Sequence, residues 1–286
     1  VFVSAKEVRI AAESIFGKMG LSEIDAHQSA DVLVTNDLRG VETHGVSNML
    51  RSYVSRYRNG SMNPRPNLII ERQTDTTAVI DADRGLGAHV AAESMRMAMD
   101  KADEHGFASV CVRNVGHMAG AGYHASLGWE RDMICMAMSG GASANSKTLP
   151  TFGAEPRFGT NPIAWAAPAG EMPGFLFDIA TTQVAGNKMQ LAGRVGARLE
   201  PGWIASQDGT PIMREVDLPD EYFMLPIGGT REQGSHKGYG IATIVDVMAS
   251  ILSGNGPGFL SGGTGFHMAA YRIEAFTDVH EYKRNM

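Results

Sequence analysis

Short apolar runs separated by helical stretches constrain the fold of this chain more than any other feature. Runs of five or six mostly apolar residues are too short for buried helices and are typical of strands, and the runs over 108–112 and 133–138 are expected to be buried. Between and before them, residues 88–102 and 120–129 have the composition of helices. The alternation predicts an α/β or α+β core. The runs are Ala108–Val112, Met133–Met138, Ile163–Ala167 and Phe175–Ile179.

The first part of the chain has a different pattern and predicts helices. Ser4 and Ser22 each stand at an N-cap position before an apolar stripe. Gly20 and Gly40 follow these stripes, where glycine commonly ends a helix. A third helical stretch is expected over residues 47–57.

Three later segments also give clear expectations. Residues 62–66 contain two prolines and predict a loop. Residues 67–84 hold two short apolar runs around a polar turn, which predicts a hairpin. Residues 239–252 are apolar on nearly all sides, which predicts a buried helix.

Composition limits the classes of partner. The chain has 286 residues and a formal net charge of −6, and no basic field that would bind nucleic acid stands out. Cys111 and Cys135 both lie in apolar runs, so we expect free thiols in a reducing compartment, the cytoplasm. No apolar run approaches the roughly 20 residues that a membrane span needs, and no signal peptide is expected at the start of the chain.

The glycine-rich strings give no standard nucleotide motif. Residues 116–122 follow an expected strand and precede an expected helix, but their glycine spacing differs from the Rossmann fingerprint. They form either a tight turn or a backbone cradle for a phosphate. Residues 141–148 resemble a P-loop but have Ser146 in place of its second glycine, and Pro150 blocks the helix that should follow. A phosphate- or nucleotide-binding protein using 141–148 is therefore kept as an alternative of another class.

The string Thr43-His44-Gly45 stands at the break between two expected helices and is the most informative local motif. Histidine titrates near pH 6.5, so it can give or take a proton at neutral pH, and the Thr43 hydroxyl could fix its tautomer. A purely structural histidine is the alternative. Lys237 lies between glycines at the start of a helix, where a cation and the helix dipole suit an anion, although it could also be a solvated lysine. No pair of histidines or cysteines has metal-ligand spacing, so no metal site is expected.

Taken in order, seven strings resemble the malate/L-lactate dehydrogenase family of non-Rossmann NAD(P)-dependent oxidoreductases, which includes L-sulfolactate and ureidoglycolate dehydrogenases. Each string is weak alone, but their shared order over nearly the whole chain is specific. They are residues 37–46, 114–123, 158–164, 177–182, 202–203, 208–211 and 237–241.

The resemblance implies roles for individual residues. His44 would be the acid that protonates the oxygen of a 2-oxo group during hydride transfer, or the base on the 2-hydroxyl in reverse, and Thr43 would polarise it. Thr160 matches a substrate-contacting position. NAD or NADP would contact the residues that match the family's cofactor-binding positions. These are His117, Met118, Ala119, Gly120, Ala121, Asp178, Ile179, Ala180, Gly186, Asn187 and Lys237.

Three departures from the family pattern bear on the substrate and the cofactor. The family's arginine, four residues after the histidine, grips the substrate carboxylate, but the chain has Asn48 there; Arg51 could substitute. Gly186-Asn187 replaces a tryptophan-glycine pair at a cofactor wall. Residues 253–264 are shorter than the matching stretch of the family, and the chain stops early after residue 286, so residues could be missing in both places.

The resemblance also implies a fold and an organisation. We expect an α/β (α+β) fold like that of L-sulfolactate dehydrogenase, with a non-Rossmann NAD(P)-binding sheet domain. Residues 1–66 would be a helical segment packing on the substrate site, 67–252 the cofactor-binding domain, and 253–286 a segment returning to the N-terminal part. The expected protein is a homodimer that interconverts small 2-oxo and 2-hydroxy acids of the malate, lactate or sulfolactate type. A cyclic-imine or diketo-acid reductase on the same scaffold is the alternative.

Overall fold

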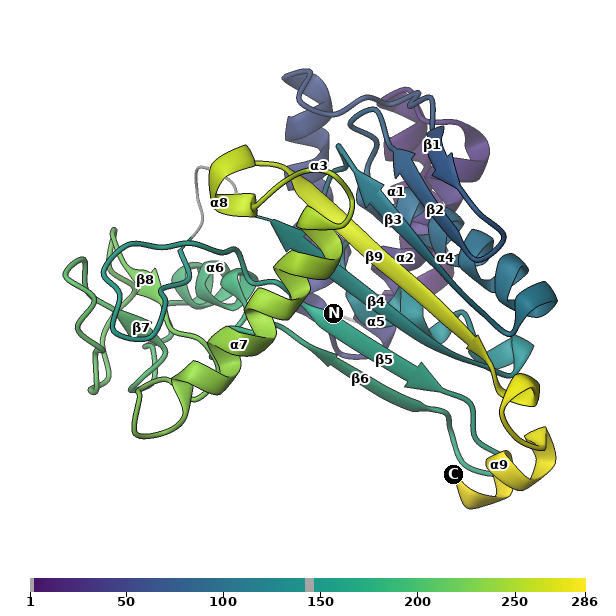
Figure 1. Ribbon diagram of the computed structural model, residues 1–286. Coiled ribbons are helices and arrows are strands. Elements are labelled where there is room, and N and C mark those ends of the chain that lie inside the picture. The colour runs from purple at the N-terminus through teal and green to yellow at the C-terminus, as the bar shows by residue number, and fades with distance from the viewer. Residues whose placement is uncertain (1–2, 142–146) are drawn as a thin grey trace. The chain divides into compact units, whose positions relative to one another are not determined.

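The computed structural model describes residues 3–141 and 147–286 (Figure 1). It divides the chain into two units. Unit 1 comprises Val1–Ala137, Ala164–Asp178 and Phe266–Met286, and unit 2 comprises Met138–Ile163 and Ile179–Gly265. Each unit therefore contains segments that are distant in the sequence.

Unit 1 begins with the three helices that the sequence predicts, α1 (Ala5–Lys18), α2 (Glu23–Leu38) and α3 (Val46–Arg58). The Ser4 side chain accepts a hydrogen bond from the Glu7 N–H, and Ser22 accepts one from Asp25, so both expected N-caps are confirmed. Gly20, with φ at +100°, follows the end of α1 in a backbone conformation that favours glycine. A short 3-10 turn, η1 (Glu42–His44), joins α2 to α3.

One seven-stranded sheet has the strand order β1-β2-β3-β9-β4-β5-β6. The predicted hairpin is confirmed as the antiparallel pair β1 and β2, while β2 pairs with β3 in parallel and β3 with β9 antiparallel. The four predicted strands are confirmed as β3, β4, β5 and β6. The bounds are β1 (Ile69–Gln73), β2 (Thr77–Asp81), β3 (Phe107–Arg113), β4 (Met133–Gly141), β5 (Ile163–Ala167), β6 (Phe175–Ile179) and β9 (Thr264–Arg272).

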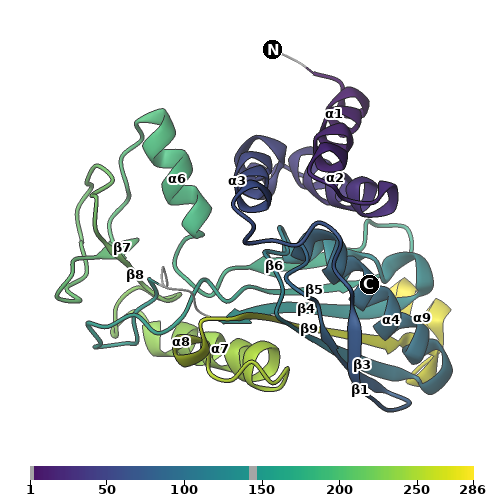
Figure 2. The same cartoon turned by 90° about the horizontal axis from the view of Figure 1, so that it is seen from above.

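Two layers of helices cover one face of this sheet (Figure 2), and the core of unit 1 consists of two apolar clusters. The first cluster lies between the sheet and α4 (Gly87–His105). Alternate residues of a strand point to opposite faces, so Val110, Cys135 and Met268 reach the same core as Met95 of α4. A second cluster joins α1, α2 and α3 to the outer side of α4 and to α5 (Ala121–Ser126). The helix expected over 120–129 is shorter than predicted, because α5 ends at Ser126 and a 3-10 turn, η2 (Trp129–Arg131), follows.

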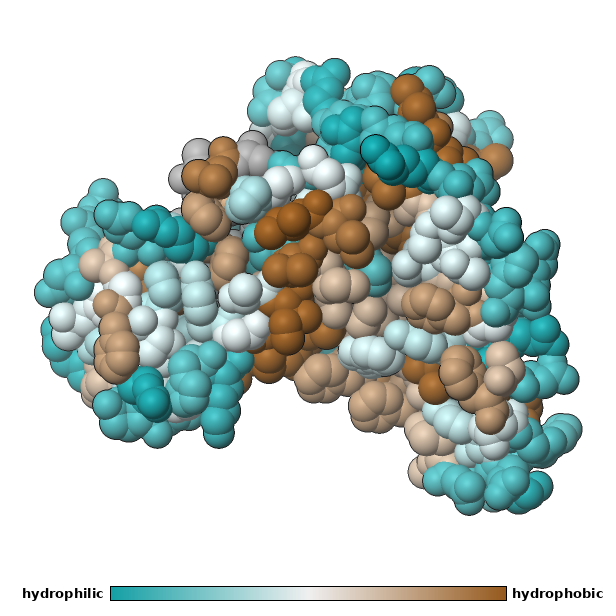
Figure 3. Space-filling model, in the orientation of Figure 1, coloured by the Kyte–Doolittle hydropathy of each residue, from teal (hydrophilic) through white to brown (hydrophobic). Residues whose placement is uncertain are grey.

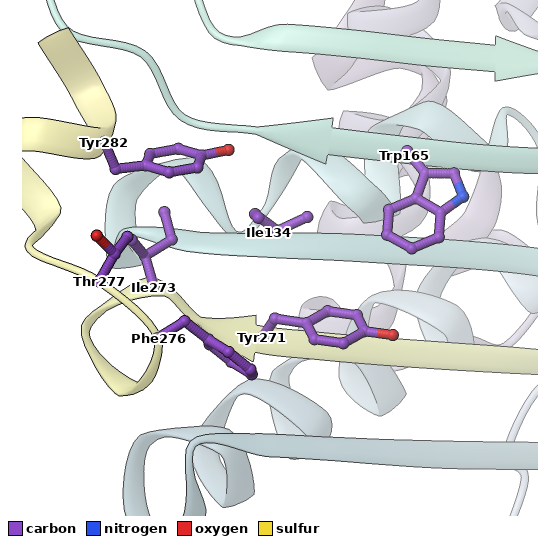
Figure 4. Close-up of a pocket in the computed structure, with 7 residues that line it drawn as sticks. All are labelled: Ile134, Trp165, Tyr271, Ile273, Phe276, Thr277 and Tyr282. Atoms are coloured by element: carbon purple, nitrogen blue, oxygen red, sulfur yellow. The ribbon is translucent and has the colours of Figure 1, made fainter. Parts of the chain in front are cut away.

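The opposite face of the sheet carries aromatic side chains. Trp165 of β5 stacks on Tyr271 of β9, with ring centroids 6.1 Å apart. These two rings line an open, largely apolar cavity of about 310 Å³ together with Ile134, Phe276 and Tyr282 (Figure 4). The chain ends beside it in the turn η4 (Ile273–Ala275) and in α9 (Val279–Asn285).

Unit 2 contains a small two-stranded sheet, several helices and its own core. Met189 and Ala192 of α6 pack with Leu199, Ile204 and Met224. The elements are α6 (Gly186–Val195), β7 (Ile204–Ala205), β8 (Phe223–Met224), α7 (Ser235–Val245), a π-helical turn η3 (Asp246–Ile251) and α8 (Gly258–Ser261).

The prediction of one buried helix over residues 239–252 is wrong in two respects. The helix changes to π-helical geometry after Val245. One side of it is also exposed, at Ile244, Val247, Ile251 and Leu252. Figure 3 shows the resulting hydrophobic band over α7 and η3. An apolar sequence does not reveal whether a neighbouring element covers each face, and here none of the residues in 3–141 and 147–286 covers one face.

Within the described parts of the chain, no helix combines the length and apolar character needed to cross a membrane.

Candidate active site

The break between α2 and α3 places His44 at a fixed point in unit 1. The Asp37 side chain accepts a hydrogen bond from the Val46 N–H at 2.9 Å, which satisfies a free amide at the start of α3. A Cβ on Gly45 would collide with the Asp37 carboxylate, so this close approach requires glycine. The motif that the sequence singled out is therefore a sharp, anchored turn.

His44 and Thr43 form the pair that the sequence predicts. The Thr43 hydroxyl lies 3.0 Å from Nδ1 of His44. His44 is half-buried, and this burial lowers the pKa of its imidazole below the usual value. When Nδ1 of a neutral imidazole forms a hydrogen bond with a hydroxyl, Nε2 remains for proton transfer.

His117 lies against His44. Their rings are stacked at a centroid distance of 5.7 Å, with 12° between the planes. Nδ1 of His117 lies 2.8 Å from the Tyr53 hydroxyl and accepts a hydrogen bond from the Ala119 N–H at 3.3 Å. Burial, and secondarily the charge of His44, lowers the pKa of His117 to about 3. The structure thus brings together two imidazoles that the sequence assigned to different roles.

Asn36 connects the His44 break with the glycine turn. Its Nδ2 donates to the His44 carbonyl at 3.2 Å, and a Cβ added at Gly120 would lie 2.8 Å from its Oδ1. Neither Asn36 nor Tyr53 was found by sequence reasoning. An asparagine within the apolar stripe of an expected helix is the signal that could have identified Asn36, whereas Tyr53 has the pattern of an ordinary core residue.

Polar backbone groups of the glycine turn, residues 116–122, form hydrogen bonds with side chains of unit 1. The Gly122 N–H, at the start of α5, donates to Asp178 Oδ2 at 2.7 Å. The Met118 carbonyl lies 2.9 Å from Nε2 of the buried His124. Met118, Ala119 and Ala121 are themselves buried. A carboxylate of the chain itself thus occupies the Gly122 N–H, one of the amides that could have held a phosphate.

Asn48 and Arg51 lie on different parts of α3. The Asn48 amide donates to the Thr43 carbonyl at 2.9 Å and so supports the turn. Arg51 lies in an open groove of about 340 Å³ with Val54, Ser55, Arg58 and Asn59. At about 100° per residue, Arg51 is roughly 200° around the helix from Tyr53, away from the side that contacts His117.

The remaining predicted site residues lie at the end of β6 and in unit 2. Ile179 and Ala180 are half-buried at the end of β6. Thr160 is half-buried, and a Cβ on Gly186 would lie 3.8 Å from its methyl group, so these two positions are adjacent. Asn161 donates from Nδ2 to the Ala242 carbonyl at 3.0 Å, which ties the Thr160 turn to α7.

Lys237 and Asn187 stand near the starts of two helices of unit 2. The Lys237 side chain is exposed in the first turn of α7, and Asn187 is half-buried in the first turn of α6. The P-loop-like string 141–148 lies mostly outside the described residues. Among the residues that the structure does describe, no group of three or more His, Cys, Asp or Glu side chains could hold a metal ion.

Comparison with known proteins gives consistent matches. A family model described as malate/L-lactate dehydrogenase matches residues 3–286. Malate dehydrogenase from Pyrococcus horikoshii is 38% identical over 263 residues, which cover 88% of this chain and 71% of that protein. The crystal structure of malate dehydrogenase from Entamoeba histolytica matches with a TM-score of 0.90 and 31% identity, over 99% of this chain and 82% of that one.

Sulfolactate dehydrogenase from Methanocaldococcus jannaschii matches with a TM-score of 0.86 and 30% identity, over 100% of this chain and 82% of that one. The predicted sulfolactate dehydrogenase-like α/β fold is confirmed. These matches define an enzyme of the NAD(P)-dependent 2-hydroxyacid dehydrogenase class. The chain belongs to the malate/L-lactate dehydrogenase family, which includes the sulfolactate dehydrogenases.

Proposed function

We propose that this protein transfers a hydride between NAD(P)H and a small 2-oxo acid of the malate, lactate or sulfolactate type, with His44 as the acid/base. The observation that carries the proposal is the His44 side chain itself. Its Nδ1 lies within hydrogen-bond distance of the Thr43 hydroxyl, and its ring stacks on that of His117. His44 belongs to the motif that resembles the family. Burial and the charge of His44 lower the pKa of His117 to about 3, so His44 is the one of the two imidazoles better suited to exchange a proton with the substrate.

The reaction needs one proton at the substrate oxygen. In the reducing direction, protonated His44 donates it to the oxygen that develops negative charge. In the oxidising direction, neutral His44 removes the proton of the 2-hydroxyl. Thr43 holds the ring through Nδ1, so the proton moves at Nε2.

The described residues fit a dinucleotide cofactor. α6 and α7 both begin without a side-chain cap. In α7 the Ser235 and Lys237 N–H groups already donate to backbone carbonyls, so the His236 amide is the first-turn donor proposed for an anion. The exposed ammonium of Lys237 adds positive charge at the start of α7, and Gly186 lies beside Thr160. When bound, a nicotinamide cofactor supplies or accepts the hydride. We propose that Lys237 contacts a phosphate or ribose, and that residues 117–121, 178–180 and 186–187 lie along the cofactor.

Substrate choice depends on how the carboxylate of the substrate is held. Asn48 stands where the family has its carboxylate-binding arginine. Its amide already donates a hydrogen bond to the Thr43 carbonyl, so Asn48 is a poor replacement for that arginine. We keep Arg51 and Thr160 as proposed substrate contacts. If Arg51 grips the carboxylate, Arg51→Met raises KM for 2-oxo acids and leaves the KM for NAD(P)H unchanged.

The test measures NADH and NADPH oxidation at 340 nm with a panel of 2-oxo acids, diketo acids and cyclic imines. General acid catalysis contributes about 10²–10⁴-fold, so we expect His44→Ala to lose that much of kcat and to keep cofactor affinity. Lys237→Ala is the contrasting variant, since it is expected to weaken cofactor binding first.

Two results would contradict the proposal. Unchanged turnover in His44→Ala would remove this residue from the mechanism. Reduction of cyclic imines or diketo acids without any reduction of simple 2-oxo acids would favour the reductase alternative on the same scaffold.

We also propose that the protein forms a homodimer, as the family resemblance implies. The exposed band of Ile244, Val247, Ile251 and Leu252 supports this, because soluble proteins rarely leave such a stripe open to water. Light scattering during gel filtration tests it. A monomer at micromolar concentration, or a dimer unaffected by Val247→Asp, would rule out pairing through this band.

A further inference from the structure

Tyr53 is a fully buried side chain of unit 1 to which the proposed reaction gives no role. It lies on α3, and its hydroxyl is 2.8 Å from Nδ1 of His117. The hydroxyl could donate to this nitrogen or accept from it, depending on the tautomer of the ring.

The backbone of Ala119 decides between these possibilities. Its N–H donates to the same nitrogen, Nδ1, at 3.3 Å. An amide N–H cannot accept a hydrogen bond, so Nδ1 carries no hydrogen. The Tyr53 hydroxyl must therefore donate as well. A neutral imidazole has one ring proton, which then resides on Nε2.

Both donors are permanent features of the site. Burial raises the pKa of Tyr53, so its hydroxyl keeps its proton at any working pH. Ala119 adopts a φ of +64°, which is unusual for a residue with a side chain, and this strained turn presents its N–H to the ring. His117 itself stays neutral above pH 3 or so, because burial lowers its pKa to about 3.

The second nitrogen of His117 remains open to a ligand. No described residue, in 3–141 or 147–286, makes a hydrogen bond to Nε2, and this atom is not among the fully buried nitrogens that lack a partner. The ring stacks on His44 at 5.7 Å. An N–H donor is thus available beside the proposed proton donor.

We propose that Tyr53 is a positioning residue that, with the Ala119 N–H, locks His117 as a neutral Nε2–H donor to the substrate carbonyl oxygen. This inference rests on the proposed function. As hydride reaches the carbonyl carbon, the C=O π bond breaks, its electron pair goes to oxygen, and the proton of His44 forms the O–H bond. His117 stabilises the developing charge through its hydrogen bond and returns unchanged.

The test compares Tyr53→Phe with Tyr57→Phe. Tyr57 lies about one helical turn further along α3, and within the described chain its buried hydroxyl has no hydrogen-bond partner, so it is a matched control. The ring nitrogens of histidine-labelled protein are observed by ¹⁵N NMR, and His117→Asn identifies the resonances. We expect a pure Nε2–H form of His117 in the wild type and in Tyr57→Phe. In Tyr53→Phe the shorter contact, at 2.8 Å, is lost and only the longer Ala119 contact, at 3.3 Å, remains, so we expect a partial Nδ1–H population.

Kinetics supply the second readout. One neutral hydrogen bond contributes about 0.5–1.5 kcal/mol, so kcat of Tyr53→Phe should fall by about 2- to 13-fold. KM should change little, and Tyr57→Phe should keep the wild-type kcat. A general loss of structure would instead alter both parameters and the melting temperature.

Three outcomes would overturn the inference: an Nδ1–H form in the wild type, an unchanged tautomer in Tyr53→Phe, or a changed tautomer with unchanged kcat. The NMR experiment needs neither substrate nor cofactor. If the wild type reduced no 2-oxo acid, the proposed function and the donor role of His117 would both fail, while NMR would still decide the tautomer lock.

Discussion

His44 and His117 have rings in contact, and their charges oppose each other. The charge of His44 is one of the causes that lower the pKa of His117, after burial. The first proton bound by the pair therefore goes to His44, and His117 stays neutral. This difference between two chemically identical side chains comes from their surroundings, since His117 receives two donors on Nδ1 and His44 contacts one hydroxyl.

The pH dependence of catalysis should report the titration of His44. Burial lowers its pKa below the usual value of about 6.5. Reduction needs the protonated ring, so kcat/KM for the 2-oxo acid should fall as pH rises through that pKa. Oxidation needs the free base, so its kcat/KM should rise over the same range. Initial rates in both directions measure this. A reduction rate that increases with pH across this range would contradict the assignment of His44 as the acid.

The sequence was informative at the residue scale where a motif carries the chemistry. Thr43-His44-Gly45 indicated the acid/base candidate and its hydroxyl partner, and the structure places those two side chains in contact. It could not indicate Tyr53, because a tyrosine in the apolar stripe of a helix is typical of a core. Its role depends on Ala119, which lies 66 positions later and meets it only in the folded chain. The catalytic and binding assignments stay predictions until the variants are measured.

At the scale of elements, the end of α2 supports both parts of the candidate site. The Asn36 side chain is almost fully buried, donates to the His44 carbonyl and packs against Gly120. Helix α2, the η1 break and the turn before α5 are thus joined through one amide. Loosening this connection should disturb the two imidazoles together.

Asn36→Ala tests this connection. Loss of the amide leaves the His44 carbonyl without this donor, so we expect a decrease of about 1–3 kcal/mol in the free energy of unfolding. kcat/KM should also fall, because His44 is less well held. Lys6→Ala, on an exposed residue of α1, is the control and should change stability by less than about 0.5 kcal/mol. Urea denaturation and steady-state rates measure the two effects. Equal behaviour of the two variants would show that Asn36 does not support the site.

Elements were predictable from the sequence where local signals suffice. The serine caps, the strand runs and the hairpin all follow from short-range chemistry, and each is confirmed. The run 239–252 shows the limit, since its composition suggested burial on all sides, whereas Ile244 and Leu252 are exposed. Whether an apolar face is covered depends on distant segments or on a second chain. The division into segments 1–66, 67–252 and 253–286 likewise stays a prediction.

At the scale of the whole molecule, buried histidines set the response to acid. His124 and His267 are 0% and 3% exposed, and burial lowers the pKa of each to about 4. In the unfolded chain both titrate near 6.5. Between these values the unfolded state binds protons that the folded state does not, so the free energy of unfolding should fall as pH decreases from about 6.5 to about 4.

The size of this effect makes it measurable. Lowering the pKa of an imidazole from about 6.5 to about 4 corresponds to roughly 3 kcal/mol at or below pH 4, a large part of the stability of a typical domain. His267→Asn should flatten the dependence of stability on pH, because the variant takes up one proton fewer on unfolding. This expectation concerns the slope and holds whatever the stability of the variant at neutral pH. His280→Gln, at an exposed position of α9, should leave the slope unchanged. Urea unfolding from pH 7 to pH 4 gives both slopes. An equal slope in wild type and His267→Asn would mean that this imidazole does not remain neutral in the folded protein.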